Sequence, residues 1–328
     1  MFNQKKIIRG GIALLLVGVI LAARQFLFSA PQKQAQDEVF VVGLKQDESQ
    51  IVEKLKTQGL IRSKLSFDLI LYLIGKHNGI QPGGYTVSQN LSAWNLAKKM
   101  TDAPDMKWVV IPEGFRKEQI GELLAKTFGW SDEELDAWNT TYTKTRIDYI
   151  EGTYFPDTYL IPVKESGLDI AKRMTRRFDE QFAPFIKQFS DQNIQWTTGL
   201  KLASIVQREA AGKDDMSLIA GILWNRLKSG MNLEIDATVQ YARGKTDAGW
   251  WAPVTADDIK NIDSPYNTYI YKGLPPHPIS NPSIMAIEAV LHPIETECLY
   301  YLHDSSKNIH CATTFEEHQA NVEQYLKK

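Results

Sequence analysis

Residues 200–211 read LKLASIVQREAA, and their apolar spacing predicts an amphipathic helix at the centre of the fold. At about 3.6 residues per turn, positions i, i+3, i+4 and i+7 share one side of a helix, and here they are Leu202, Ile205, Val206 and Glu209. The other side takes Lys201, Ser204, Gln207 and Arg208. A carboxyl group therefore stands where an apolar residue is expected.

Glu209 is thus predicted to face inward. A carboxyl group among apolar neighbours resists ionisation, so its pKa rises toward neutral pH and it can donate a proton in catalysis. The alternative is a structural glutamate paired with an arginine or with backbone N–H donors. The helix by itself leaves both interpretations open.

Composition excludes several classes of function. The 328 residues carry 37 Lys and Arg against 39 Asp and Glu, a net charge of -2 that argues against nucleic acid as a partner. The six histidines show no HExxH spacing, and the chain has no Gly-x-Ser-x-Gly elbow and no glycine-rich phosphate loop. We expect neither a metal ion nor a nucleotide cofactor.

The N-terminus predicts a membrane anchor. Gly10–Ala23 is uninterrupted apolar sequence behind Lys5, Lys6 and Arg9, and through Phe28 it reaches the roughly 20 residues of a bilayer span. A cleaved signal is the alternative, but Phe28-Ser29-Ala30 makes a poor cleavage site. We expect residues 1–28 to be a cytoplasmic tip and retained anchor, 29–37 a linker, and the remainder to lie outside.

The exported part has an α+β pattern. A small domain is expected at 38–104, with a strand at Val39–Val42 and a capping box of Asp47 and Gln50. A larger domain follows at 105–328, without alternating βαβ order. Its expected helices begin near Arg116 and cover 132–138, 168–188, 199–211 and 214–229; strands are expected at 108–111 and 236–241, with a C-terminal hairpin and a last helix from about Phe315.

The two cysteines, Cys298 and Cys311, flank that hairpin, whose turn is Asp304–Asn308. They could face each other across it as a disulfide worth roughly 3 kcal/mol, or remain two free thiols.

Four stretches combine rigid prolines with polar side chains suited to a hydroxyl-rich polymer: EGTYFPDTY (151–159), DATVQY (236–241), SPYNTY (264–269) and GLPPHPISNP (273–282). The chain resembles the MltG (YceG-like) family of membrane-anchored endolytic murein transglycosylases. Besides EGTYFPDTY, the segments that carry this resemblance are LASIVQREA (202–210), WNRLKSGMNLEIDATVQYA (224–242), SPYNTYIYKGLPPHPISNPS (264–283) and TTFEEHQAN (313–321). The resemblance extends over essentially the whole chain.

This resemblance implies a LysM-like domain at 38–104 and a catalytic domain at 105–328 on the extracytoplasmic side of a bacterial inner (plasma) membrane. It implies a lyase that cleaves the β-1,4 bond between MurNAc and GlcNAc in nascent peptidoglycan strands and leaves 1,6-anhydroMurNAc ends, without a cofactor. Glu209 would be the acid and then the base. Peptidoglycan synthases are candidate partners. The substrate-binding residues implied by the matching motifs are Asp157, Asp236, Gln240, Tyr241, Asn267, Thr268 and Tyr269.

Two departures from the family pattern stand out. Many members carry Glu where this chain has Gln207, which points away from Glu209 on the helix. Near the C-terminus a family His-x-Phe pattern aligns with Ile309 and Cys311, so His310 is one residue late and its role is in doubt.

Two rival functions remain. A muramidase that uses water would need Asp157 or Asp236 as a second carboxylate and would leave reducing ends. A non-catalytic glycan-binding scaffold would keep its cellular effect after Glu209→Gln.

Overall fold

The computed structural model describes residues 17–18, 25, 27–144 and 151–327, and divides the chain into two compact units. Unit 1 comprises Met1–Val109 with Tyr159–Lys164, and unit 2 comprises Val110–Thr158 with Glu165–Lys328. Most of the predicted anchor lies outside the described residues. Within the described part, no helix combines the length and the apolar character that crossing a membrane requires.

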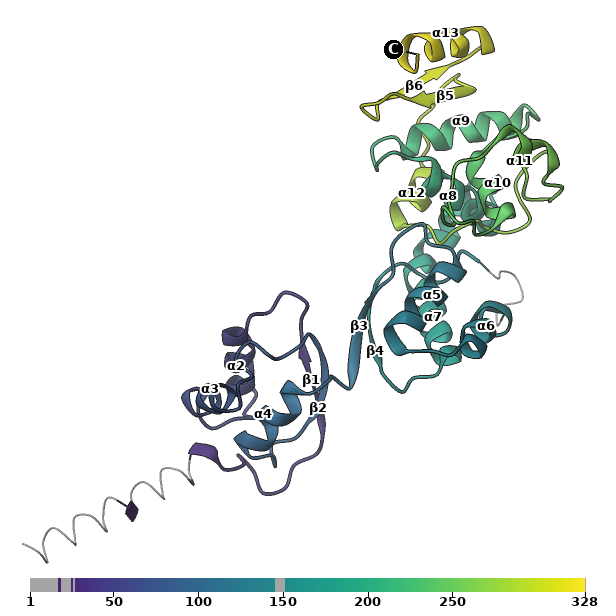
Figure 1. Cartoon of the computed structure of the whole chain (residues 1–328). Coiled ribbons are helices and arrows are strands. Elements are labelled where there is room, and N and C mark those ends of the chain that lie inside the picture. Colours follow the sequence, from purple (N-terminus) through teal and green to yellow (C-terminus); the bar gives the residue numbers. More distant parts are fainter. Residues whose placement is uncertain (1–16, 19–24, 26, 145–150, 328) are drawn as a thin grey trace, which may run out of the picture. The chain divides into compact units, whose positions relative to one another are not determined.

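Unit 1 places three helices beside a sheet (Figure 1). The strands of the four-stranded sheet follow the order β1 (Glu38–Val42), β2 (Gly83–Val87), β3 (Met106–Val110) and β4 (Thr158–Pro162). β1 and β2 are antiparallel in a register from Glu38↔Val87 to Val42↔Gly83. The helices are α2 (Glu48–Thr57), α3 (Lys64–Leu73) and α4 (Ala93–Thr101).

Local sequence explains these elements well. The predicted capping box is present, since the Asp47 carboxylate accepts from the backbone N–H of Gln50 at 2.9 Å and the Asp47 N–H donates to the Gln50 side chain. The sheet and helices share one buried core of Phe40, Leu55, Phe67, Tyr85, Leu96 and their neighbours. The assignment of this unit as LysM-like stays a prediction.

Unit 2 is mainly helical. Its first helices are α5 (Lys117–Phe128), α6 (Asp132–Thr140), the short η1 (Tyr142–Lys144) and α7 (Gly167–Asp191). They are followed by α8 (Trp196–Glu209), α9 (Met216–Lys228), α10 (Asp236–Arg243), α11 (Ala256–Asn261) and α12 (Ile284–Leu291). The unit ends with the hairpin β5 (Tyr300–His303) and β6 (Ile309–Ala312) and with α13 (Phe315–Tyr325), which packs on the hairpin (Figure 1).

Helix α8 is packed on more sides than its sequence pattern predicts. It contacts α7, α9, α10 and α12, and its buried residues include Leu202, Ile205 and Val206. Ser204, placed on the outer side by the periodicity, is fully buried. The reason is a loop that covers it, because the Ile279 N–H donates to the Ser204 hydroxyl at 3.0 Å.

The expected strand at 236–241 is wrong, because these residues form α10. The apolar alternation that suggested a strand is buried as one short helix containing Ala237, Val239 and Tyr241. Asp236 occupies the first turn, where a carboxylate favours helix formation. The Thr238 hydroxyl donates to the Ile235 carbonyl at 2.6 Å and stabilises the helical start.

The other expected elements of unit 2 are confirmed, including the C-terminal hairpin and the final helix. The sequence pattern did not predict α11 or α12 in this unit, nor β4 in the sheet of unit 1.

Candidate active site

Glu209 is the last residue of α8, and its partly exposed side chain lines a cavity of about 330 Å³ in unit 2. The other lining residues come from α9, the loop between α9 and α10, the start of α10, the loop between α11 and α12, the hairpin and α13: Arg226, Leu233, Glu234, Ile235, Asp236, Tyr269, Tyr300, Tyr301, Phe315 and His318. The cavity thus combines carboxylates with aromatic rings, as expected of a site for a polar, ring-shaped ligand.

A wider hollow of about 1030 Å³ lies beside α2 in unit 1. Its buried carboxylate, Glu48, is already occupied by the His77 imidazole at 2.5 Å and by the backbone N–H of Asn78. We therefore place the candidate active site in the smaller cavity, where Glu209 has an oxygen left to meet a ligand.

The environment of Glu209 favours its protonated form. Burial raises the pKa of the Glu209 carboxyl above its ordinary value, and the nearby charge of Asp236 adds to the rise. A hydrogen bond from Tyr301 and the charges of His303 and Arg208 oppose it. The net effect is a carboxyl that holds its proton to higher pH than an exposed glutamate does.

Tyr301 is the direct partner of Glu209. Its hydroxyl donates to Glu209 Oε2 at 2.7 Å. Burial, followed by the charge of Glu209, raises the pKa of Tyr301 well above the ordinary value for tyrosine. Tyr301 is therefore a neutral donor that stabilises the carboxylate form of Glu209.

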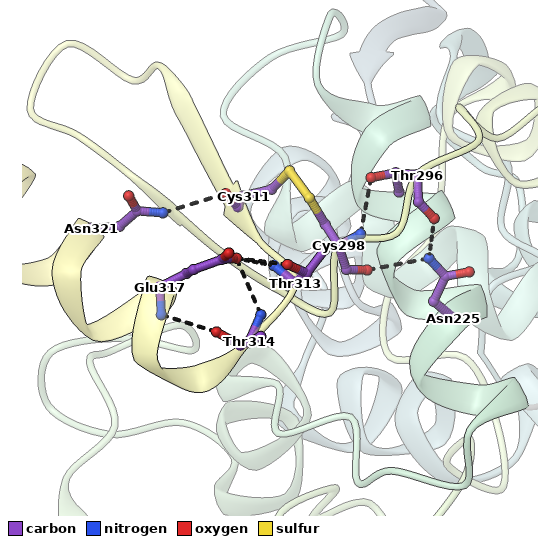
Figure 2. The surroundings of a disulfide bond; sticks show 8 residues. All are labelled: Asn225, Thr296, Cys298, Cys311, Thr313, Thr314, Glu317 and Asn321. Atoms are coloured by element: carbon purple, nitrogen blue, oxygen red, sulfur yellow. Dashed lines mark hydrogen bonds between the residues drawn. A yellow bond between two sulfur atoms is a disulfide. The ribbon is translucent and has the colours of Figure 1, made fainter.

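The hairpin that carries Tyr301 is held in place by a disulfide (Figure 2). Cys298 and Cys311 are joined, which resolves the alternative left open by the sequence, and Cys311 is the register partner of Tyr301. The Asn225 amide of α9 donates to the carbonyls of Thr296 at 2.6 Å and Cys298 at 3.2 Å. The strand is thereby tied to a core helix beside the cavity.

The turn after Glu209 is fixed by Asp215. Its carboxylate accepts from the backbone N–H of Ala211 at 2.9 Å and of Gly212 at 3.2 Å. The same carboxylate lies 2.7 Å from His303 Nε2 on β5. The end of α8 and the strand that carries Tyr301 are therefore linked by two contacts, Glu209 with Tyr301 and Asp215 with His303.

Two of the seven predicted substrate-binding residues lie in the cavity with Glu209. They are Asp236 and Tyr269, and the Tyr269 hydroxyl donates to Asp236 Oδ1 at 2.7 Å. Burial raises the pKa of Tyr269, and the hydrogen bond to Asp236 adds to the rise, so it too is a neutral donor.

Asn267 and Thr268 are buried beneath the cavity wall. The Asn267 amide oxygen accepts from the Tyr269 N–H at 3.1 Å, and the Thr268 hydroxyl accepts from the Ile235 N–H at 3.0 Å. Since these bonds fix the backbone of Tyr269 and the residue before Asp236, both side chains position cavity residues.

The remaining three predicted residues lie outside the cavity. The Asp157 carboxylate accepts from Arg177 Nε at 2.8 Å. The Gln240 amide donates to the Ala252 carbonyl at 3.1 Å, and the buried Tyr241 ring stacks under the Arg116 guanidinium at 4.1 Å. Each of them fastens a loop or a neighbouring element.

Sequence reasoning missed the wall formed by Arg226, Tyr300, Tyr301 and His318. The Tyr300 ring stacks on His318 at 5.5 Å between ring centres, and the Arg226 guanidinium lies 5.1 Å from the Tyr300 ring. Burial and the charge of Arg226 lower the pKa of His318. The only available signal was that Arg226 and His318 fall within two of the long matching segments.

His310, whose role was in doubt, lies outside this wall. Its Nε2 is 3.0 Å from Asp304 Oδ2, and its ring stacks on Tyr325 with centres 3.6 Å apart. Among the residues that the structure describes, no group of three or more His, Cys, Asp or Glu is arranged to hold a metal ion.

A mixed α+β fold with a raised-pKa carboxyl in a polar cavity has the arrangement of a general acid–base enzyme. Comparison with known proteins identifies the family: the model of the YceG-like family matches residues 40–324, and the chain belongs to that family.

Named relatives agree with this assignment. The chain is 29% identical over 300 residues to an endolytic murein transglycosylase of Bacillus subtilis, covering 85% of this chain and 82% of the relative. An endolytic murein transglycosylase of Streptococcus pneumoniae is 27% identical over 354 residues, covering 96% of this chain and 64% of the relative, so the chain spans less than two thirds of the streptococcal protein. A crystal structure of a YceG-like protein from Listeria monocytogenes superposes with a TM-score of 0.60 at 25% identity, covering 88% of this chain and 99% of that one.

These findings confirm the predicted family, the mixed α+β fold and the prediction that the chain is an enzyme, a lyase of the transglycosylase class.

Proposed function

We propose that this enzyme is an endolytic lytic transglycosylase of peptidoglycan. It cleaves the MurNAc-β-1,4-GlcNAc bond within nascent glycan strands and leaves 1,6-anhydroMurNAc ends, which terminates strand elongation. The observation that supports this most is the raised-pKa carboxyl of Glu209 in a cavity, hydrogen-bonded to Tyr301 at 2.7 Å.

The mechanism needs one carboxyl group. Protonated Glu209 gives its proton to the glycosidic oxygen as the bond to C1 breaks, and the hydroxyl of Tyr301 stabilises the carboxylate that forms. The carboxylate then takes the proton from the C6 hydroxyl of the muramoyl ring. The C6 oxygen attacks C1 and closes the 1,6-anhydro ring, so no water is consumed and Glu209 regains its proton.

Substrate binding is assigned to the polar and aromatic groups around Glu209. Asp236 and Tyr269 would contact sugar hydroxyls, and the Tyr300 ring offers an apolar face for a pyranose. Asn267 and Thr268 would support these contacts from beneath, and Asp157, Gln240 and Tyr241 would support them through the surrounding loops.

A second candidate function is a muramidase that uses water. Asp236 favours it, because a second carboxylate in the same cavity could activate a water molecule. Asp157, the other carboxylate considered, is held by Arg177 outside the cavity. The two functions differ in product: reducing ends for the muramidase and anhydro ends for the transglycosylase.

The cellular setting is part of the proposal. Residues 1–28 would anchor the enzyme in a bacterial inner membrane in a single pass, with both units on the extracytoplasmic side. Nascent strands emerge there, so peptidoglycan synthases are the proposed partners. The support is the charged N-terminus followed by the apolar run Gly10–Ala23.

Product analysis of the full chain on uncrosslinked glycan strands tests the function. Mass spectrometry should find 1,6-anhydro ends at internal cuts. Glu209→Gln should lower the rate by about 10² to about 10⁴, the usual contribution of a general acid or base, while glycan binding and the melting temperature persist. Glu180→Gln, at an exposed site on α7, is the matched control. Reducing ends would favour the muramidase. Glycan binding without cleavage by the wild type would support the scaffold, and cleavage by Glu209→Gln at the wild-type rate would refute the role given to Glu209.

A further inference from the structure

Helix α3 in unit 1 is apolar on two opposite sides. Its inner side places Phe67, Ile70 and Leu71 in the core. Its outer side exposes four large apolar residues at helical spacing: Leu65 (82% exposed), Leu69 (48%), Tyr72 (74%) and Leu73 (63%). A helix that is apolar all round is normally covered by a partner, and a contiguous exposed apolar patch marks an interaction site.

The chain that leaves the predicted anchor is attached to unit 1 close to this patch. The Phe28 side chain, at the end of the predicted anchor, packs against the core of unit 1. Arg62 donates through Nε and Nη2 to the Ala30 carbonyl at 3.1 and 3.0 Å, and through Nη2 to the Pro31 carbonyl at 3.0 Å. The backbone N–H of Gln32 donates to the Gln89 carbonyl at 3.0 Å. Unit 1 is therefore hydrogen-bonded to the start of the predicted linker.

These contacts limit how far the patch can lie from a bilayer. Leu65 follows Arg62 by three residues, or at most about 10 Å of chain. The ten residues of α3 then extend about 15 Å. If the span ends at Phe28, Ala30 and Pro31 lie in the headgroup layer, which is roughly 5 to 8 Å thick on each side. The Arg62 side chain then reaches the headgroup layer, and the start of α3 lies within about 10 Å of Arg62.

We propose that the outer face of α3, formed by Leu65, Leu69, Tyr72 and Leu73, docks into the interfacial layer of the bilayer. This rests on the proposed anchor. The chemistry fits, because leucine side chains enter the acyl boundary and tyrosine is favoured at the headgroup level. Exposed Lys76 flanks the patch and can meet anionic lipid phosphates, whereas Lys64 at the start of the helix is paired with Glu53. Docking holds unit 1 against the membrane at two points.

A depth-sensitive fluorophore tests the docking. The two native cysteines form a disulfide, so NBD attached at Leu69→Cys labels one position of the full chain. The protein is reconstituted in vesicles of phosphatidylethanolamine and phosphatidylglycerol. NBD emission should shift to shorter wavelength, be quenched by spin-labelled lipid and resist aqueous iodide. Leu44→Cys is the matched control, because Leu44 is 52% exposed in the same unit, and its label should respond to iodide.

Three results would overturn the docking. Release of the chain from the vesicles by alkaline carbonate would refute the anchor and the docking together. A retained chain whose label at 69 is quenched by iodide as strongly as the label at 44 would refute the docking alone. A label at 69 that is shielded from both quenchers would show that a second copy of the chain covers α3. Tyr72→Cys repeats the test if Leu69→Cys does not fold. None of these outcomes depends on the chemistry at Glu209.

Discussion

Removing the hydroxyl of Tyr301 is the sharpest test of how the cavity controls Glu209. In Tyr301→Phe the ring remains, but the 2.7 Å hydrogen bond to Glu209 Oε2 is lost. A hydrogen bond to a charged group contributes about 1.5 to 3 kcal/mol. Because this bond strengthens as Glu209 gives up its proton, its loss should lower kcat by about 10-fold to about 150-fold if bond cleavage limits the rate.

The same substitution should move the pH profile in one direction. The Tyr301 hydrogen bond lowers the pKa of Glu209, so its removal raises that pKa further. An acid must hold its proton before the reaction, so activity falls as pH rises through its pKa. The alkaline limb should therefore move to higher pH in Tyr301→Phe.

The assay is the rate of appearance of anhydro ends from glycan strands across pH, with Tyr271→Phe as the control. The control Tyr271→Phe also removes a tyrosine hydroxyl that donates to a carboxylate, that of Asp263, but Tyr271 lies outside the cavity. A Tyr301→Phe profile that coincides with the wild type, or an alkaline limb that moves to lower pH, would refute the role given to Tyr301.

Three further predictions concern stability. Reducing the disulfide that closes the β5–β6 hairpin, whose cysteines are 13 residues apart, should cost about 3 kcal/mol and lower Tm by about 6 to 12 °C; an unchanged Tm would contradict this. Gly199→Ala places a Cβ 2.2 Å from Phe189 Cε1. The variant should be destabilised, because an overpacking cost of about 1 to 3 kcal/mol should outweigh a helix-propensity gain of about 1 kcal/mol. The control Gly212→Ala has open space around the new Cβ and should melt no earlier than the wild type. Burial, with the charge of Glu118, raises the pKa of Glu151 to about 8, so resistance of the protein to urea should fall as pH rises through that value. Glu151→Gln should make this resistance less dependent on pH. A wild type equally resistant at about pH 6 and about pH 9 would contradict the prediction.

The position of Glu209 could be predicted because it depends on local geometry. Helical periodicity over ten residues places it beside Leu202 and Ile205 whatever the tertiary fold. Tyr301 could not be predicted in the same way, since it is 92 residues away and meets Glu209 only after the hairpin docks on α9. The failure at 236–241 has the same origin: packing of Tyr241 and Val239 overrode a local alternation that resembled a strand.

The motif residues show how a sequence pattern can mark a site without marking contact with the ligand. Asn267 and Thr268 are fully buried, and their hydrogen bonds end on the backbone beside Tyr269 and Asp236. A buried amide or hydroxyl with a required partner tolerates few replacements, so such positions define a motif as strictly as residues that touch substrate. We therefore expect Asp236 and Tyr269 to affect substrate binding directly, and Asn267 and Thr268 to act through stability.

Using one carboxyl as both acid and base requires opposing influences on it. Burial and the Asp236 charge keep Glu209 protonated before the reaction, whereas the Tyr301 hydroxyl, His303 and Arg208 stabilise the carboxylate after the proton leaves. If the influences that raise the pKa were too strong, Glu209 would be too weak an acid to protonate the glycosidic oxygen. If the influences that lower the pKa were too strong, Glu209 would already be ionised before the reaction. The raised pKa of Tyr301 is part of this balance, because only a neutral tyrosine can donate its hydroxyl proton in a hydrogen bond to the Glu209 carboxylate. The hairpin that fixes Tyr301 is thus as much a part of the chemistry as the helix that ends in Glu209.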